Sequence, residues 1–244
     1  MKKIGVIPAR YKSSRFPGKP LVEILGIPMI IRVANIVAEA LGKENTIIAT
    51  EDVRIKELVE SYGYKIIMTS KNCLTGTDRV WEVAQQIEAD IYINIQGDEP
   101  VLDPDDILKI AKEKVNYPDY VINGMIDISI DEDPHNINIP KVLVNSKNEL
   151  IYMSRLAIPG KKEQSNKFPK YKKQVCIYAF SYNDLKVYGE ANGKAEYEKF
   201  EDIEILRFFD HSIPVKMVET SRTSLAVDVI EDVANVERYL RENS

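Results

Sequence analysis

The sequence predicts an α/β fold built on a mainly parallel, doubly wound sheet. Short, almost wholly apolar runs are typical of strands buried on both faces, and they stand at 3–8, 46–50, 65–68 and 91–95. Between them lie segments with apolar residues at helical spacing, at 28–41, 51–62, about 78–88 and about 104–115. Strands that alternate with helices, with no hairpin between them, pair in parallel through right-handed crossovers.

The second half of the sequence is richer in strands. Further strands are expected at 121–126, 175–180 and 214–218, and a pair at 140–144 and 150–153 joined by a turn at 146–148. Helices are expected at 195–210 and 230–242. Residues 160–173 carry six lysines and no strong apolar pattern, which predicts a mobile surface loop. We therefore expect one domain over 1–244, with a β-rich insert at about 120–190.

Composition excludes several classes of protein. The chain has 244 residues and a formal net charge of −5, which argues against non-specific nucleic-acid binding because such binding needs a basic face. No apolar run reaches the length of a membrane span, and the first residues lack the apolar core of a signal peptide. Cys73 and Cys176 have no metal-ligand spacing, so we expect free thiols, a reducing compartment and a cytoplasmic location.

The segment after the first strand, residues 8–20, is the first candidate site. Ligands of doubly wound sheets bind beyond the carboxyl ends of the strands, and this segment places Arg10, Arg15 and Lys19 there. Three cations among small residues with accessible amides suit a polyphosphate. The order of residues differs from that of a P-loop, so ATPase-type chemistry is not expected. The alternative is a solvated basic loop.

Two acidic positions are candidates for a metal site. Asp98 follows the apolar strand 91–95, and Asp228 precedes the last helix. Magnesium is commonly held by one or two carboxylates together with phosphate oxygens of the substrate. The alternatives are a turn at Gly97-Asp98 and helix capping at Asp228. In the segment 75–79, Thr77 could cap a helix whose amides bind an anion or a base edge.

Other kinds of site have little support. His135 and His211 lack cysteine or histidine partners, so a zinc site is not expected. The sequence has neither a Gly-x-Ser-x-Gly nucleophile elbow nor a Gly-x-Gly-x-x-Gly dinucleotide motif after a strand. Trp81 is expected to be a core residue on a helix face.

Eight segments, in this order, resemble one family of enzymes. They are IPARYKSSRFPGKPL at 7–21, ATED at 49–52, MTS at 68–70, TGTDR at 75–79, NIQGDEP at 94–100, YMSRLAIP at 152–159, IYAF at 177–180 and EKFEDIEILR at 198–207. The chain is similar over almost its whole length to the cytidylyltransferases that activate 3-deoxy-manno-octulosonate (Kdo), the CMP-Kdo synthetases. The first segment and NIQGDEP are specific in combination.

The resemblance implies a fold of nucleotide-diphospho-sugar transferase type, dimeric through its β-rich part. It implies a Mg²⁺-dependent transfer of CMP from CTP to a 3-deoxy sugar acid, with release of pyrophosphate. It makes Arg15, Lys19, Asp98 and Asp228 catalytic, the last two as metal ligands. The positions implied to bind CTP are Pro8, Ala9, Arg10, Ser14, Arg15, Lys19, Thr69, Ser70, Gly76, Thr77, Asp78, Arg79, Gln96 and Asp98. Those implied to bind the sugar acid are Arg155, Gln174, Tyr178 and Glu204.

The chain departs from the family pattern in its acceptor half. Gln174 and Cys176 stand where the family usually has His and Gly, Ile205 where it has Gln, and Gly160 where it has Trp. The changes at Gln174 and Ile205 are expected to alter the sugar pocket or its wall. The acceptor could therefore be Kdo, its 8-amino analogue, another capsule sugar acid or a phosphonate. A non-catalytic nucleotide-binding protein is a further alternative, but it would have no need of both Asp98 and Asp228.

Overall fold

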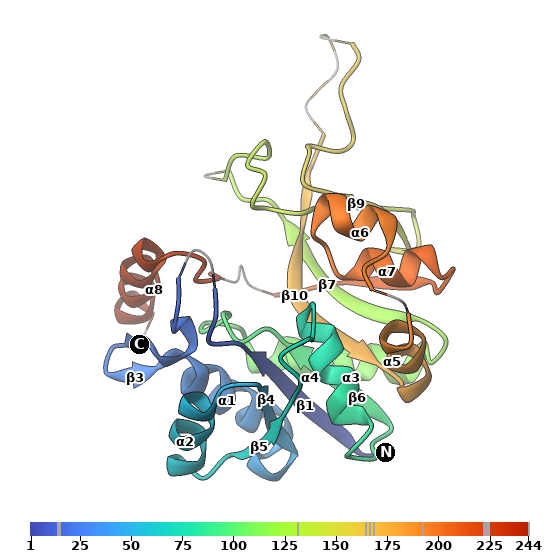
Figure 1. Ribbon diagram of the computed structural model, residues 1–244. Helices are drawn as coiled ribbons and strands as arrows, with labels where there is room; N and C mark the ends of the chain where they lie inside the picture. Colours follow the sequence, from blue (N-terminus) through green and yellow to red (C-terminus); the bar gives the residue numbers. More distant parts are fainter. Residues whose placement is uncertain are drawn as a thin grey trace.

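The computed structural model describes residues 1–13, 16–130, 132–163, 165, 167, 169–191, 193–221 and 225–243. Its central sheet runs in the order β11-β7-β10-β6-β1-β4-β5 (Figure 1). The strands of this sheet are β1 (Lys3–Ala9), β4 (Thr46–Thr50), β5 (Lys65–Met68), β6 (Ile91–Ile95), β7 (Val121–Asp127), β10 (Lys172–Phe180) and β11 (Val215–Glu219). The predicted α/β fold is confirmed.

Most neighbours in the sheet are parallel. β1 pairs in parallel with β4 and β6, β4 with β5, and β11 with β7. β10 is the exception, because it runs antiparallel between β6 and β7. This strand places the second half of the chain beside the carboxyl end of β6, where ligands of such sheets bind.

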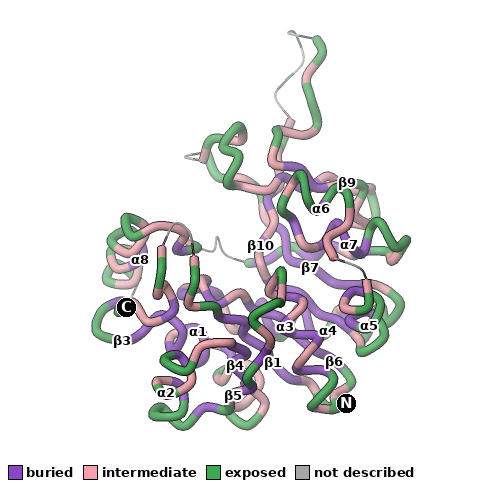
Figure 2. Tube along the Cα trace, viewed as in Figure 1, coloured by how far each residue is buried: buried purple, intermediate pink, exposed green. Residues whose placement is uncertain are grey.

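Helices cover both faces of the sheet, and Figure 2 shows the buried strands between them. One core contains apolar residues of α1 (Met29–Leu41), α2 (Val53–Ser61) and α4 (Pro104–Asn116). The other contains residues of α3 (Gly76–Ala84), α5 (Tyr182–Gly189) and α7 (Ile205–Asp210). Trp81 is in this second core, 8% exposed, as predicted.

A small apolar cluster closes the amino-terminal half. The hairpin of β2 (Glu23–Ile24) and β3 (Ile27–Pro28) packs with α8 (Ile230–Glu242), and Val227 is fully buried between them. The 3-10 turns η1 (Lys19–Leu21) and η2 (Lys43–Asn45) complete this half. Within the described ranges, no helix combines the length and the apolar character needed to cross a bilayer.

The β-rich segment contains the expected hairpin. β8 (Lys141–Val144) and β9 (Leu150–Ser154) pair antiparallel, and Asn148 takes a positive φ of 57° in the turn between them. The described residues between β9 and β10 form no helix or strand and project from the body (Figure 1). The predicted loop at 160–173 is wrong at its end, because Lys172 and Lys173 belong to β10 and Lys173 pairs with Glu132.

The single helix predicted at 195–210 is wrong. The segment forms α6 (Glu196–Glu201) and α7, separated by Asp202 in the left-handed conformation with φ 50°. The side chain of Arg155 donates hydrogen bonds to the carbonyl oxygens of Glu201 and Asp202. In a continuous helix those oxygens would accept from residues four positions later. The side chain of Arg155, which follows β9, therefore replaces the backbone hydrogen bonds that a continuous helix would make.

We expect Gly189→Ala to destabilise the fold. A Cβ at Gly189 would overlap the indole ring of Trp81, and overpacking of this kind costs about 1–3 kcal/mol. Gly160→Ala is the control, because a Cβ there meets nothing within 4 Å. Urea unfolding of the two variants measures the difference. Equal free energies of unfolding would contradict the tight packing of α5 on α3.

Candidate functional site

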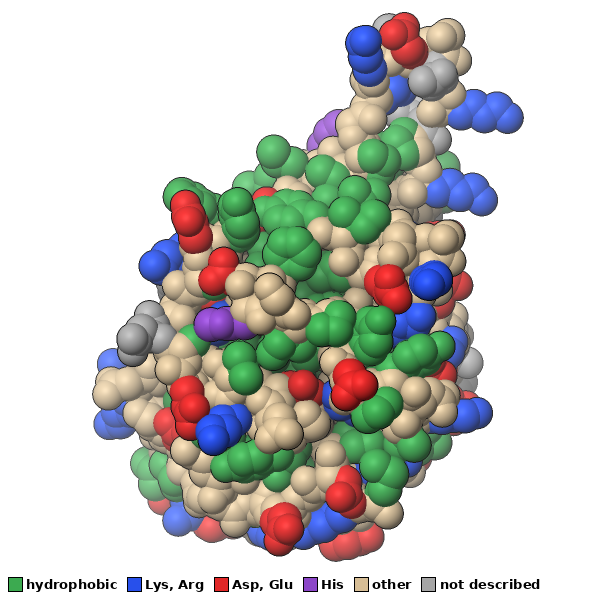
Figure 3. Space-filling view, turned by 90° about the vertical axis from the view of Figure 1, so that its right-hand side faces the viewer, with side chains coloured by type: hydrophobic (Ala, Val, Ile, Leu, Met, Phe, Trp, Pro, Cys, Tyr) green, Lys and Arg blue, Asp and Glu red, His purple; other side chains and the backbone are tan. Residues whose placement is uncertain are grey.

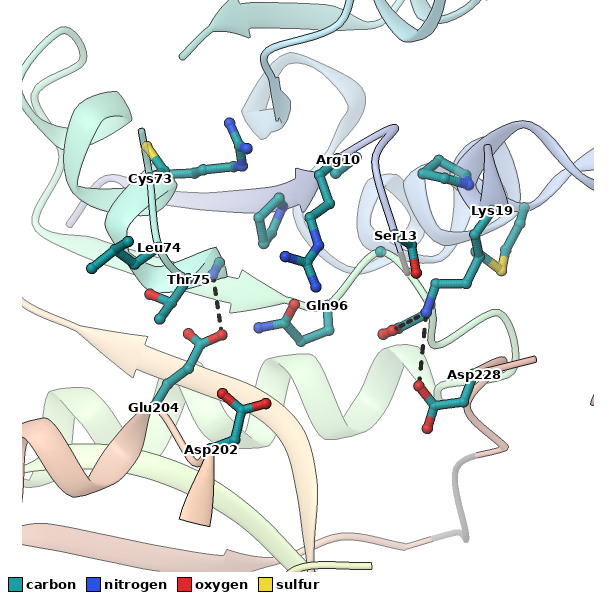
Figure 4. A pocket seen from close by; sticks show the side chains of 18 of the residues that line it. Arg10, Ser13, Lys19, Cys73, Leu74, Thr75, Gln96, Asp202, Glu204 and Asp228 are labelled. Atoms are coloured by element: carbon teal, nitrogen blue, oxygen red, sulfur yellow. Dashed lines mark hydrogen bonds and ion pairs between the residues drawn. The ribbon is translucent and has the colours of Figure 1, made fainter. Parts of the chain in front are cut away.

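A cavity of about 310 Å³ lies beyond the carboxyl ends of β1 and β6. One wall comes from the segment after β1, one from the start of α3 and the end of β6, and one from the region of α6 and α7 (Figure 4). The lining residues are Pro8, Ala9, Arg10, Ser13, Lys19, Pro20, Met29, Cys73, Leu74, Thr75, Gly76, Arg79, Gln96, Gly97, Asp98, Lys194, Asp202, Glu204 and Asp228.

Lys19 is the point where three segments meet. Its ammonium donates to Asp98 Oδ2 at 2.7 Å and to the carbonyl oxygen of Val227 at 2.7 Å. Asp228 Oδ1 is 4.0 Å from the same Nζ. Gly18, with φ 74°, supplies the left-handed turn from which η1 and Lys19 begin. The predicted grouping of Lys19, Asp98 and Asp228 is therefore present in the structure.

These carboxylates have the chemistry of a magnesium site that a substrate completes. Among the described residues, no group of three or more His, Cys, Asp and Glu side chains is arranged to hold a metal ion. Asp98 and Asp228 offer two hard oxygen donors at the cavity, and phosphate oxygens commonly supply further ligands to Mg²⁺. Neighbouring Glu99 is buried, with Oε2 lacking a hydrogen-bond partner. Burial, and then the charge of Asp98, raise the pKa of Glu99 to about 8.

A buried ion pair supports the loop after β1. Arg79 Nη2 lies 2.7 Å from Glu51 Oε2, with the two side chains 6% and 11% exposed. The other carboxylate oxygen of Glu51 accepts from the backbone N–H of Tyr11 at 3.2 Å. The guanidinium of Arg54 stacks on the Tyr11 ring, 3.3 Å from its centroid. Glu51 thus joins the start of the basic loop to α3.

Arg79 also organises the strand end at 68–70. It donates from Nη1 to Thr69 Oγ1 at 2.6 Å and to the carbonyl oxygen of Ser70 at 3.1 Å. Thr69 and Ser70 lie behind the cavity wall, and Arg79 itself lines the cavity. Arg79 therefore links α3 to the 68–70 segment and to Glu51.

The first turn of α3 binds a carboxylate of this same chain. Glu204 accepts from the N–H of Gly76 at 3.1 Å, from the N–H of Thr77 at 2.9 Å and from Thr77 Oγ1 at 2.5 Å. Burial raises the pKa of Glu204, while the bonds to Thr77 and Gly76 act against that rise. The anion expected at these amides is therefore protein-derived, and it links α7 to α3.

The capping residue of α3 is Thr75 rather than Thr77. Thr75 Oγ1 accepts from the N–H of Asp78, and Asp78 accepts from the N–H of Thr75, which is a capping box. Thr77 is the second residue of α3, and its hydroxyl donates a hydrogen bond to Glu204. Asp78 also accepts from Arg207 Nη1 at 2.8 Å. Arg207 is 1% exposed and forms a second ion pair with buried Glu198 at 2.7 Å.

The residues predicted for the sugar acid are not gathered in the cavity. Glu204 lines the cavity. Arg155 lies outside the lining and donates to the carbonyl oxygens of Glu201, Asp202 and Ile137. Tyr178 is 3% exposed in the core, and burial raises its pKa well above the usual range.

β10 contains a bulge that the sequence pattern did not reveal. Gln174 donates to Asn123 Oδ1 at 3.0 Å. Buried Asn123 in turn donates to the carbonyl oxygens of Val175 and Ile177, both at 2.9 Å, where the pairing register shifts. An asparagine inside an apolar strand is the signal that could have found this bulge, because a buried amide needs partners.

The expected effect of Ile205 on the sugar pocket is wrong. Ile205 is 1% exposed in the core that includes Phe208 and Tyr188. Ile205 is the first residue of α7, and its side chain packs in the interior of the molecule. Gly160 is exposed, with nothing within 4 Å of a Cβ, and it too is outside the cavity lining.

Ten of the predicted site residues line one cavity: Pro8, Ala9, Arg10, Lys19, Gly76, Arg79, Gln96, Asp98, Glu204 and Asp228. Seven lie outside the lining: Thr69, Ser70, Thr77, Asp78, Arg155, Gln174 and Tyr178. Ser14 and Arg15 are outside the described residues. Ser13, Leu74, Lys194 and Asp202 also line the cavity but were not predicted as site residues. A loop lysine such as Lys194 and a helix-end aspartate such as Asp202 belong to no recognisable motif.

Comparison with known proteins identifies the family of this chain. The family model for cytidylyltransferases matches residues 4–218. The 3-deoxy-manno-octulosonate cytidylyltransferase of Escherichia coli is 36% identical over 93% of this chain and 91% of its own length. The mitochondrial enzyme of that name from Arabidopsis thaliana is 36% identical, over 99% of this chain and 84% of its own. A solved CMP:2-keto-3-deoxy-manno-octonic acid synthetase, complexed with CTP, superposes with a TM-score of 0.91 at 34% identity, with all of both chains covered.

The fold, the cavity and the family match together define a nucleotidyltransferase, an enzyme of the cytidylyltransferase family. Within that family, the two relatives that carry the same enzyme name align with 99% and 93% of this chain. The chain belongs to the 3-deoxy-manno-octulosonate cytidylyltransferases, the CMP-Kdo synthetases, and the resemblance seen in the sequence is confirmed.

We expect Glu51→Gln to lower the free energy of unfolding by about 3–5 kcal/mol, because it leaves the buried Arg79 guanidinium without its charge partner. Lys56→Gln is the matched control, since it breaks an exposed pair with Glu60 on the neighbouring helix α2 and should cost at most about 0.5 kcal/mol. Denaturant unfolding compares the two. A loss of similar size in both variants would show that the Glu51–Arg79 pair does not support the loop.

Proposed function

We propose that this enzyme transfers CMP from CTP to Kdo or a close sugar-acid analogue, with release of pyrophosphate. The observation that carries the proposal is the position of Lys19 between Asp98 and Asp228 in a cavity bounded by the motifs of residues 7–21, 75–79 and 94–100. The relative with the superposable fold is named as complexed with CTP, which supports CTP as the donor.

The nucleotide is proposed to bind along the walls after β1, β5 and β6. Arg10, Arg15 and Lys19 bind the triphosphate, because cations and loop amides suit its charge. Gln96 and the 68–79 segment face the cytosine and the ribose. Arg79 acts by holding this segment against Glu51, as its hydrogen bonds indicate.

Asp98 and Asp228 are proposed to hold Mg²⁺. When bound there, the ion would neutralise phosphate charge and lower the pKa of the attacking hydroxyl. In the structure Lys19 pairs with Asp98 at 2.7 Å and lies 4.0 Å from Asp228, so its one charge offsets only part of the two negative charges. An arriving triphosphate offers Lys19 an anionic partner at the same place, so the ammonium can move to the phosphates while the carboxylates bind the cation.

The reaction is a direct displacement at the α-phosphorus of CTP. The anomeric hydroxyl oxygen of the sugar acid attacks, the new O–P bond forms, the bond to the bridging oxygen of pyrophosphate breaks, and the hydroxyl proton passes to solvent. Arg15 and Lys19 stabilise the charge that develops on the leaving pyrophosphate. Positioning and electrostatics supply most of such a transfer, so no covalent enzyme intermediate is required.

A homodimer is proposed from the apolar surface of the β-rich part. Exposed apolar side chains gather over β9, α6 and α7 (Figure 3). They are Ile151, Leu156, Tyr197, Phe200 and Phe209, of which Phe200 is 82% exposed. Clustered apolar side chains of this kind mark interaction surfaces, and the resemblance implied dimerisation through this part. The cytoplasmic location stays a prediction; Cys73 and Cys176 are free thiols in the structure.

We expect Asp98→Asn to reduce pyrophosphate release below about 1% of the unaltered enzyme, which corresponds to about 2.7 kcal/mol or more in transition-state stabilisation. The change removes one charge proposed to bind the metal. Its amide oxygen can still accept from Lys19 and the pair is partly exposed, so thermal unfolding should change little. Asp105→Asn, on the exposed start of α4, is the control. Turnover of Asp98→Asn at the rate of the unaltered enzyme would remove Asp98 as a metal ligand.

A second expectation concerns the base. Pyrophosphate release with Mg²⁺ and Kdo should be greater with CTP than with ATP or GTP, because a cavity bounded by Gln96 and the 68–79 segment suits a single pyrimidine ring. Parallel assays with Kdo, 8-amino-Kdo, sialic acid and phosphonates identify the acceptor. Equal turnover of the three nucleotides would contradict base recognition. CTP binding without release for any acceptor would favour a non-catalytic nucleotide-binding protein.

A further inference from the structure

The cavity wall opposite the nucleotide motifs carries its own charges. Lys194, Asp202 and Glu204 line this wall, from the segment before α6 and the turn between α6 and α7. Figure 4 shows Asp202 and Glu204 facing Arg10 and Gln96 across the cavity. Both carboxylate oxygens of Glu204 accept hydrogen bonds from the start of α3. Lys194 and Asp202 are the charged groups of this wall without such bonds to α3.

The other cations that line the cavity, Lys19, Arg79 and Arg10, come from the opposite side, and the first two have partners there. Lys19 is held by Asp98 and Val227, and Arg79 by Glu51, Thr69 and Ser70. Arg10 belongs to the loop after β1, where the polyphosphate is expected. Among the lining residues that the structure describes, Lys194 is thus the cation of the α6–α7 wall.

The arginine that the family resemblance assigns to the sugar acid has other partners. Arg155 directs Nε to the carbonyl oxygen of Glu201 and Nη2 to that of Asp202 at 3.0 Å. Its Nη1 donates to the carbonyl oxygen of Ile137 at 2.9 Å. All three nitrogens of the guanidinium therefore bind backbone, and the side chain fixes the left-handed turn at Asp202.

Lys194 and Asp202 form an ion pair on that fixed turn. Lys194 Nζ lies 2.5 Å from Asp202 Oδ1, and the side chains are 25% and 72% exposed. The hydrogen bond from Lys194 is the largest cause that lowers the pKa of Asp202, so its carboxylate is charged at neutral pH. Because this carboxylate is mostly in contact with water, it can give up the ammonium at small cost.

We infer that Lys194 binds the carboxylate of the acceptor, in exchange for the carboxylate of Asp202, and that this residue sets the affinity of the enzyme for its sugar acid. The inference rests on the proposed function and assigns a residue outside every motif that the sequence shares with the family. The ammonium of Lys194 meets one carboxylate in either state, so no buried charge is left without a partner. The turn at Asp202 holds the pair at the cavity in the absence of substrate.

The test is steady-state kinetics of Lys194→Met with CTP, Mg²⁺ and Kdo. The apparent KM for the acceptor should rise about tenfold or more, as expected for loss of one charge-assisted hydrogen bond. The KM for CTP, and kcat at saturating acceptor, should stay within about twofold, because the residue contacts neither the nucleotide nor the reacting atoms. Lys194→Arg, which keeps the charge, should recover most of the affinity.

Lys199→Met is the matched control. Lys199 is exposed on α6, five residues further along the chain and outside the cavity lining, so its loss should leave both KM values unchanged. An unchanged acceptor KM in Lys194→Met, or an equal rise in the KM for CTP, would overturn the assignment while leaving the proposed function in place. Absence of turnover by the unaltered enzyme with any sugar acid would overturn both.

Discussion

The ammonium of Lys19 joins three segments that are far apart in the chain. It binds Asp98 after β6, the carbonyl oxygen of Val227 ahead of α8, and it lies 4.0 Å from Asp228. In the described structure these contacts hold the loop after β1 against the end of β6. Two carboxylates that share one ammonium would repel each other more strongly without it. The site is therefore a charged cluster. In the proposed complex a metal ion would take the position of the Lys19 ammonium beside the carboxylates, and the ammonium would bind the triphosphate.

A second contact closes the cavity from the other half of the chain. Glu204 lies at the start of α7 and binds the amides at the start of α3. Because the amides at a helix N-terminus carry partial positive charge, they suit a carboxylate even where burial raises its pKa. Behind this contact, Arg207 binds both Asp78 on α3 and Glu198 on α6. These contacts hold the wall that carries Lys194 and Asp202 in a fixed position relative to α3.

Much of the fold could be predicted because its central strands are apolar and alternate with amphipathic helices. The direction of β10 could not, because a buried strand has the same composition in parallel and antiparallel pairing. The break at Asp202 was missed because it depends on Arg155, which is distant in sequence and removes two helical hydrogen bonds. Short helices such as α5 were missed for a related reason, since tertiary packing on Trp81 stabilises them.

The candidate site shows the same division. Lys19, Asp98 and Asp228 were found because residues that follow parallel strands meet at one edge of the sheet. The resemblance made Tyr178 a sugar-acid contact, and Ile205 was expected to alter the sugar pocket, yet both side chains are buried. Which face a residue of a bulged strand or a short helix presents depends on local register, and Asn123 fixes that register on β10. Lys194 could not be found from the sequence, because it precedes α6 and its partner Asp202 follows that helix.

The central claim is that the cluster around Lys19 is where triphosphate and metal ion bind together. A crystal structure of the complex with CTP and Mn²⁺, with anomalous diffraction to locate the manganese, tests it most directly. We expect an anomalous peak coordinated by both Asp98 and Asp228 and by phosphate oxygens, with Lys19 Nζ moved from Asp98 to the triphosphate. A peak held by phosphate oxygens alone, with Lys19 still bound to Asp98, would contradict it.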